Sequence, residues 1–209
     1  MQLELSPAEL KKLVAKQLDH LFIFKPDIEQ DALEGGVANA LKKCEVCFAS
    51  TTNKYYRCNG EAYFSPFHSG QYSIFLYFLG RAVFVANPEM RSLADRIYYL
   101  NKALNSLDLF YEVEMPDIFF LDHPVGSVLG RAQYGSHFSF SQNCTVGNNK
   151  GVFPILGKNV QMMSGSKILG RCTIGDNVIV AANTYIKDSD IPEDSLVFGS
   201  SPNLTIKSR

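Results

Sequence analysis

An apolar side chain recurs every six residues through the second half of the chain. Counting by six forward from Leu156, and backward from Val146, meets an apolar residue at every step. The positions are Leu156, Met162, Ile168, Ile174, Val180 and Ile186, and Val146, Phe140, Tyr134 and Val128. This period matches neither the 3.6 residues of a helix nor the two residues of a strand. Self-similarity at one fixed short period predicts a solenoid of stacked coils.

The two series are out of step by four residues, which predicts a short insertion around 148–154. Small residues follow the apolar position, and a second modest side chain lies four residues after it, as at Cys144, Ser166, Cys172 and Thr184. We expect each step to form one flat strand and one corner, with the apolar side chain pointing into a narrow interior. The alternative, a β-sandwich, would show alternating polarity with turns every 8–12 residues. The spacing itself does not give the handedness of the coil.

The first half of the chain has the period of helices. Ser6-Pro7-Ala8-Glu9 predicts a helix start with a capping box, and Leu10, Leu13, Val14, Leu18 and Leu21 follow at helical spacing. A second helix is predicted after Pro26, with Leu33, Val37, Ala40, Leu41 and Cys44 on one face, and two more near 71–85 and 89–107. The polar segment 49–70 is interpreted as a loop. The fold class predicted is α+β, with a helical domain at 1–107 and a β-helix at 108–209.

Charge and hydropathy exclude several classes of protein. Twenty basic and twenty-one acidic residues leave a net charge of −1, without the basic excess that nucleic-acid binding requires. The first five residues show no secretory signal pattern, so a cytoplasmic location is expected. The apolar stretch 72–85 contains Gly80 and Arg81 and is shorter than the ~20 residues that span a bilayer. It predicts a buried helix, and no membrane association is expected.

The five cysteines are an odd number and are interpreted as free thiols. Cys44 and Cys47 form a C-x-x-C pair, which could be half of a zinc site with Cys58 and His68. That spacing fits no common zinc module, so ordinary helix packing is the favoured interpretation and no metal is expected.

Three segments of the second half resemble the serine acetyltransferases. Residues 121–126, Leu-Asp-His-Pro-Val-Gly, look like the family's Leu-Asp-His-Ala-Thr-Gly. Residues 142–147, Gln-Asn-Cys-Thr-Val-Gly, are similar to its Gln-Ser-Val-Thr-Leu-Gly, and residues 164–170 to its Ala-Gly-Ala-Lys-Ile-Leu-Gly. The resemblance extends over 67–207, whereas the first 60 residues match only in being helical. It implies a left-handed parallel β-helix that transfers an acetyl group from acetyl-coenzyme A to a hydroxyl of a small metabolite.

The resemblance also assigns catalytic roles. It makes His123 the general base, Asp108 the carboxylate that orients it, and Asp122 and Gln142 contacts of the acceptor. The assignment makes chemical sense because an imidazole titrating near neutral pH can take the proton of a hydroxyl as that hydroxyl attacks a thioester. A carboxylate on the other ring nitrogen fixes the tautomer and stabilises the imidazolium. The competing interpretation is that Asp122 and His123 only turn a corner.

Coenzyme A binding is carried over in the same way. In the family the cofactor lies in a groove between coils, where small side chains allow close approach to the backbone. The corresponding positions are Gly147, Asn148, Ser164 and Ala182, with Lys187 for a phosphate. Each of these residues could equally be an ordinary corner residue of the coil with no role in binding.

The chain departs from the family where the acceptor is held. The family's Arg-His-Pro, which binds serine, aligns with Val152-Phe153-Pro154 in a loop four residues shorter. The family's Asp-Ile-His-Pro becomes Asp108-Leu109-Phe110-Tyr111. Loss of a bidentate cation weakens carboxylate binding, so Phe153 predicts a more apolar acceptor site, for a sugar ring or a modified amino acid. The tail that docks cysteine synthase in the family has no counterpart here, so that partnership is not expected.

Three other functions remain open at this point. Acetylation of a sugar or nucleotide-linked sugar, on a hydroxyl or an amine, would use His137 as the base. A metal-dependent hydratase on the same solenoid needs three histidines on zinc, whereas the coil domain holds only His123 and His137. A coil that serves only in assembly would release no thiol from acetyl-coenzyme A. The resemblance further implies a homotrimer, with the helical half available to pair trimers into hexamers.

Overall fold

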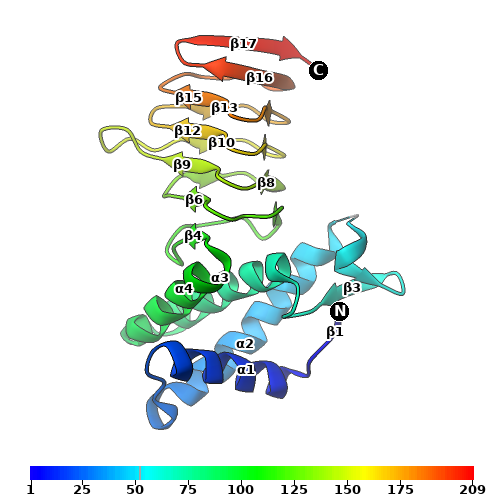
Figure 1. Ribbon diagram of the computed structural model, residues 1–209, viewed down its shortest axis with the longest axis vertical. Helices are drawn as coiled ribbons and strands as arrows, with labels where there is room; N and C mark the ends of the chain where they lie inside the picture. Colours follow the sequence, from blue (N-terminus) through cyan, green and yellow to red (C-terminus); the bar gives the residue numbers. More distant parts are fainter. Residues whose placement is uncertain (52) are drawn as a thin grey trace. The chain divides into compact units, whose positions relative to one another are not determined.

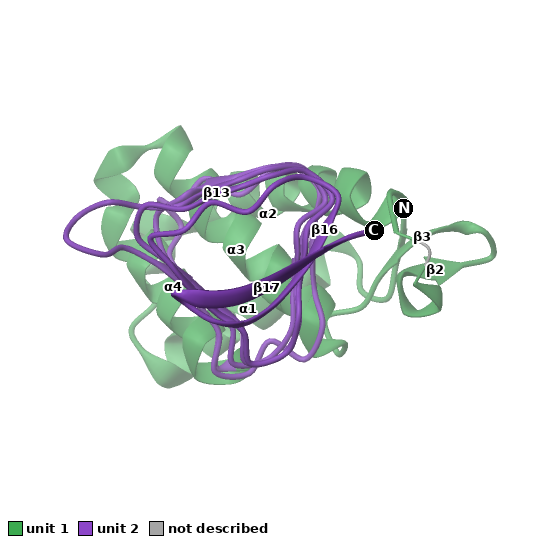
Figure 2. Ribbon diagram, turned by 90° about the horizontal axis from the view of Figure 1, so that it is seen from above, with its two compact units in different colours: residues 1–105 green, residues 106–209 purple. Residues whose placement is uncertain are grey.

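The computed structural model describes residues 1–51 and 53–209. The chain forms two compact units, Met1–Asn105 and Ser106–Arg209, coloured separately in Figure 2. The boundary falls where helix α4 (Arg91–Asn105) ends, and the first strand of the solenoid, β4 (Asp108–Leu109), begins three residues later. Ser106 and Leu107 therefore connect the two kinds of pattern.

The first unit begins with the predicted capping box. The Ser6 hydroxyl accepts a hydrogen bond from the Glu9 backbone N–H, and the Glu9 carboxylate accepts one from the Ser6 N–H, which fixes the start of α1 (Pro7–Leu21). Helix α2 (Pro26–Ala49) also starts at a proline and buries the predicted face. Leu21 is exposed instead of buried because α1 ends there.

Two further helices complete this unit. Helix α3 (Ser69–Ala86) buries all of its side chains from Gln71 to Leu79 and packs against α2 and α4; a short 3-10 turn, η2 (Pro88–Met90), precedes α4. The helix predicted over 72–85 is confirmed, and it is buried from Tyr72 to Leu79 and at Val83, whereas Val85 is 63% exposed. No helix in the described chain combines the length and apolarity needed to cross a bilayer.

The interpretation of residues 49–70 as a loop is wrong for most of its length. A 3-10 turn, η1 (Lys54–Tyr56), leads into β2 (Arg57–Cys58) and β3 (Glu61–Phe64), which form an antiparallel hairpin; β1 (Gln2–Leu3) adds to β3 in parallel. The turn is Asn59-Gly60, with φ of 52° and 83°, and this dipeptide is the strongest short signal for a hairpin. Thr52 lies outside the described residues.

The C-x-x-C pair is part of the packing of α2. Cys44 and Cys47 are both buried one turn apart, and burial raises the pKa of the Cys44 thiol well above its usual range, with Cys47 adding to the effect. His68 has a separate role, since its Nδ1 accepts a hydrogen bond from the Gln71 N–H and caps α3. Among the described residues, no group of three His, Cys, Asp or Glu side chains is arranged to hold a metal.

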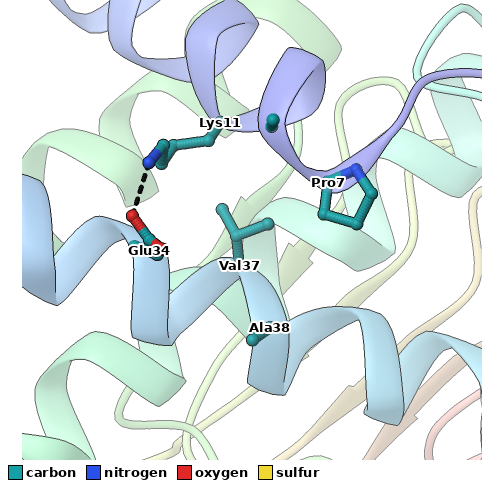
Figure 3. A pocket seen from close by; sticks show the side chains of 6 residues that line it. Pro7, Lys11, Glu34, Val37 and Ala38 are labelled. Atoms are coloured by element: carbon teal, nitrogen blue, oxygen red, sulfur yellow. Dashed lines mark hydrogen bonds and ion pairs between the residues drawn. The ribbon is translucent and has the colours of Figure 1, made fainter.

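A pocket of about 280 Å³ lies between α1 and α2 (Figure 3). It is lined by Pro7, Ala8, Lys11, Glu34, Val37 and Ala38. Lys11 and Glu34 form an ion pair across it. None of the residues predicted for catalysis or for coenzyme A lines it.

The second unit is the predicted solenoid, with three faces that Figure 2 shows end on. Face A contains β4, β6 (Val128–Leu129), β9 (Thr145–Gly147), β12 (Lys167–Leu169) and β15 (Tyr185–Lys187). Face B contains β7 (Gln133–Tyr134), β10 (Ile155–Leu156) and β13 (Thr173–Ile174). Face C contains β5 (Phe119–Leu121), β8 (Phe138–Phe140), β11 (Gln161–Met162), β14 (Ile179–Val180) and β16 (Ser195–Ser200), and β16 continues onto face A.

All pairing between coils is parallel, and the solenoid closes with an antiparallel strand, β17 (Asn203–Ser208), on β16. We name the corners by the faces they join. Corner CA comprises residues 122–127, 141–144, 163–166 and 181–184. Corner AB comprises 130–132, 148–154, 170–172 and 188–190. The predicted insertion is the long segment of corner AB, the yellow-green loop between β9 and β10 in Figure 1.

The six-residue count gives the interior correctly except at its first position, Val128, and at Tyr134, which is only half-buried. The positions from Val146 to Ile186 in the two series are buried, but Val128 is 42% exposed. The inward side chain is Leu129, which is 2% exposed and pairs with Val146 across the coils. The step from Leu129 to Tyr134 is five residues, so the corner at 130–132 is one residue short and the count slips.

This slip predicts opposite results for two neighbouring substitutions. Leu129→Ala removes a buried side chain, so we expect it to lower the free energy of unfolding by about 2–5 kcal/mol. Val128→Ala, on the exposed side of the same strand, should change it by less than about 1 kcal/mol. Denaturant unfolding measures both, and a larger loss at Val128 would contradict the register described above.

Candidate active site

The predicted base lies where face C turns into face A. Strand β5 ends at Leu121, and the turn that follows holds His123 at φ 49° and Gly126 at φ 75°. Its backbone is fixed by hydrogen bonds from Asp122 N to Phe140 O (3.0 Å) and from Gly126 N to Ser106 O (2.9 Å). A Cβ at position 126 would meet Asn143 Oδ1 at 2.4 Å, so the turn requires glycine there. The result is an imidazole displayed on the outside of the coil.

The His123 side chain is 83% exposed and lies next to Asp122. The Nε2 atom of the ring lies 3.5 Å from Asp122 Oδ1. Asp108 lies on β4, and its N–H donates to Ser127 O at 2.9 Å, at the end of the turn that begins with Asp122. The structure therefore places Asp108 beside the turn that carries His123, while the orientation of His123 by Asp108 stays a prediction.

Three more predicted residues stack on the same corner in successive coils. Gly165 N donates to Gln142 O and Asn183 N to Ser164 O, both at 2.9 Å. Ala182 is the next corner residue in this column. Corner CA therefore gathers Asp122, His123, Gln142, Ser164 and Ala182 along one edge of the solenoid.

The remaining predicted residues lie at the other end of face A. Gly147 is the last residue of β9, and its carbonyl oxygen accepts a hydrogen bond from Gly170 N at 3.0 Å. Lys187 is the last residue of β15. Asn148 and Phe153 lie on the loop 148–154, where the Phe153 side chain is 38% exposed. Within one chain, face A separates these four residues from the group at corner CA.

Corner AB also carries charged side chains that the sequence analysis did not single out. Backbone N–H donors hold the pKa of two carboxyls below the usual range: Arg171 N bonds to Asp188 (3.0 Å) and Thr173 N to Asp190 (2.8 Å). Arg131 pairs with Glu112 at 3.2 Å and lies 5.9 Å from the centre of the Phe110 ring. The sequence did offer a signal for Asp188 and Asp190, because short acidic residues at a corner commonly accept hydrogen bonds from nearby backbone N–H groups.

The alternative base lies elsewhere. His137 is the last residue of the corner between faces B and C, at φ 63°, and is exposed. Its Nδ1 lies 3.0 Å from the Ser136 hydroxyl. It therefore belongs to a different edge from the group that contains His123.

Comparison with known proteins gives concordant results. A sequence model of the bacterial transferase hexapeptide family (six repeats) matches residues 153–188. Serine acetyltransferase from Helicobacter pylori is 30% identical over 127 residues, which cover 54% of this chain and 73% of that protein. The structure superimposes on serine acetyltransferase from Brucella abortus in complex with coenzyme A with a TM-score of 0.70, at 18% identity, over 99% of this chain and 83% of the other. For serine acetyltransferase isoform 3 from Entamoeba histolytica in complex with cysteine, the TM-score is 0.66 at 18% identity, over 97% and 74%.

Helices followed by a left-handed parallel β-helix of six-residue coils define this chain as a hexapeptide-repeat acyltransferase. Within that class, the chain belongs to the serine acetyltransferase family. The fold class predicted from the sequence is confirmed.

Proposed function

We propose that the chain transfers an acetyl group from acetyl-coenzyme A to a hydroxyl of a small acceptor, with His123 as the general base. The observation that carries this proposal is the exposed imidazole on corner CA, next to Asp122, in the segment that resembles the family's Leu-Asp-His. Relatives with this fold have been solved in complex with coenzyme A, which supports the same co-substrate here.

The proposed reaction follows from the chemistry of an imidazole beside a thioester. The neutral ring takes the acceptor's hydroxyl proton as the oxygen attacks the thioester carbonyl, so a C–O bond forms. The tetrahedral intermediate then collapses, the C–S bond breaks, and the imidazolium returns the proton to the sulfur of coenzyme A. Asp108 is the proposed partner of the ring nitrogen that does not take the proton, since a carboxylate there stabilises the imidazolium.

The acceptor site is proposed to include Asp122, Gln142 and the loop residues Val152 and Phe153. Val152 and Phe153 are partly exposed and uncharged, so neither of these two side chains can pair with a carboxylate. Asp122 offers a carboxylate for an amino group. Serine or a related hydroxyl compound is the proposed acceptor, and the hydroxyl or amine of a sugar is the alternative that the apolar loop favours. A cytoplasmic location stays a prediction from the sequence.

We further propose that the site is completed between chains of a homotrimer. The predicted residues form two groups at opposite ends of face A, so one chain alone does not bring His123 to Phe153 or Lys187. A closed threefold ring, in which corner CA of one copy meets corner AB of the next, would bring the two groups together. Pairing of two trimers through their helical units is the larger assembly that this proposal allows.

Two histidine substitutions test the proposed base. His123→Ala should lower kcat for thiol release from acetyl-coenzyme A by about 10²–10⁴-fold, the usual contribution of a general base. His137→Ala, an exposed histidine at another corner, should leave the rate within about twofold. A loss at His137 with activity retained at His123 would favour the alternative base.

A second experiment tests the acceptor. Replacing Val152 by Arg and Phe153 by His restores the two side chains that bind serine in the family, so the KM for serine should fall about tenfold, equivalent to ~1.4 kcal/mol. Ile155→Arg places a cation on face B as a control and should not change this KM. An unchanged KM in the double variant would show that the shorter loop, and not the missing charge, determines the acceptor.

The proposed trimer has its own measurement. Light scattering coupled to size exclusion should give three times the chain mass, or six times if trimers pair. A monomer at the enzyme concentration used for thiol release would argue against a site shared between chains.

A further inference from the structure

We infer that the hydrogen bond between Asn149 and Asp188 fixes the loop 148–154, which makes Asp188 a positioning residue for the acceptor wall at Phe153. The inference rests on the proposed function for its catalytic consequence, but the geometry of the bond does not depend on that function. Neither Asn149 nor Asp188 is among the residues proposed to touch either substrate.

The bond ties the loop to a distant part of the solenoid. Asn149 Nδ2 donates to Asp188 Oδ2 at 2.6 Å, across 39 residues of sequence and two coil levels, from β9 past β12 to β15. The loop's own hydrogen bonds are local: Asn149 and Val152 exchange backbone bonds of 3.0 Å, and Asn148 Oδ1 accepts from Gly151 N. Those bonds close the hairpin, and the bond to Asp188 holds the hairpin against the coil, so that it also protects those local bonds from opening.

The intervening coil leaves space for this contact. Gly170, at φ 80°, occupies the corner between the two partners. A Cβ at this position would lie 2.2 Å from Asp188 Oδ1 and 2.6 Å from Asn149 Cβ. Only glycine therefore allows the side chains of the coils on either side to meet over it.

The Asp188 carboxylate is also held in place by the backbone of the coil next to it, independently of its bond to the loop. Asp188 Oδ1 accepts from Arg171 N at 3.0 Å, and the Asp188 N–H donates to Leu169 O at 3.1 Å. Each carboxylate oxygen thus has one N–H donor, and the side chain presents Oδ2 to Asn149 in a fixed direction. At its other end the loop is tied by Gln133 N to Pro154 O, at 3.1 Å. Val152 and Phe153 lie between these two attachments.

The chemistry of the pair allows a charge-exchange test. Asn149→Asp alone puts two carboxylates in contact, so the attraction becomes repulsion and the loop should detach. Asp188→Asn alone keeps the acceptor for Arg171 N, and a flipped Asn149 amide can still bond to it. The double variant, with the two residues exchanged, restores a charged bond with its polarity reversed. The matched control is Asn177→Asp, because Asn177 Nδ2 donates to Asp194 Oδ1 at 2.9 Å at another corner of the same unit.

The kinetic measurement is thiol release as a function of acceptor concentration. We expect Asn149→Asp to raise the acceptor KM five- to twentyfold, and to raise the acetyl-coenzyme A KM by a smaller factor, because Gly147 is held separately by Gly170 N. The double variant should return the acceptor KM to within twofold of the unsubstituted enzyme. An acceptor KM in Asn149→Asp no higher than in Asn177→Asp, or no recovery in the double variant, would overturn the inference.

Amide hydrogen exchange measures the loop without reference to activity. The Val152 N–H, which bonds to Asn149 O, should exchange at least tenfold faster in Asn149→Asp, and at the original rate in the double variant and in Asn177→Asp. Unchanged exchange in Asn149→Asp would refute the positioning role even if activity fell. If the unsubstituted enzyme releases no thiol with any acceptor, that result would count against the proposed function. The hydrogen-exchange result would then still show whether the Asn149–Asp188 bond positions the loop.

Discussion

The arrangement of this site depends on backbone hydrogen bonding between parallel coils. Each strand donates to the coil next to it in strict register, as Leu129 does with Val146 and Ile168 with Ile186. Because the register repeats, a residue at a corner lies directly over its counterpart in the next coil. Side chains far apart in sequence therefore form columns along the edges, and an edge is where an exposed imidazole can meet groups from several coils.

The sequence predicts this arrangement wherever the repeat is regular. From Ser164 to Ala182 the step is 18 residues, one full coil of three six-residue steps, so their stacking follows from counting alone. The count fails at Val128 because the corner that follows β6 is one residue short, and a period contains no information about a local deletion. It also gives no account of the Asn59-Gly60 hairpin, whose signal is a turn dipeptide and not a repeat.

The site itself was predicted only in part. Resemblance supplied His123 and the small residues of corner CA, and the structure places them on one edge. It could not show that Phe153 and Lys187 lie at the other end of face A, because that division appears only when strand directions are known. The partnership of Asn149 with Asp188 was equally hidden, since their separation of 39 residues is not a multiple of 18 and includes the out-of-step segment.

The loop 148–154, as a proposed part of the acceptor site, offers a way for such a scaffold to change its substrate without changing its fold. The coils on either side are fixed by interior packing and backbone bonds, so an insertion at a corner alters neither the buried column nor the register beyond it. Its position must then be set by side chains, and Gly170 makes room for that contact between two coils. Where the family has a cation and an imidazole in this loop, the present chain has Val152 and Phe153 in a shorter segment. In the proposed site, selection of the acceptor would thereby be separated from His123, which belongs to a turn that the coil itself defines.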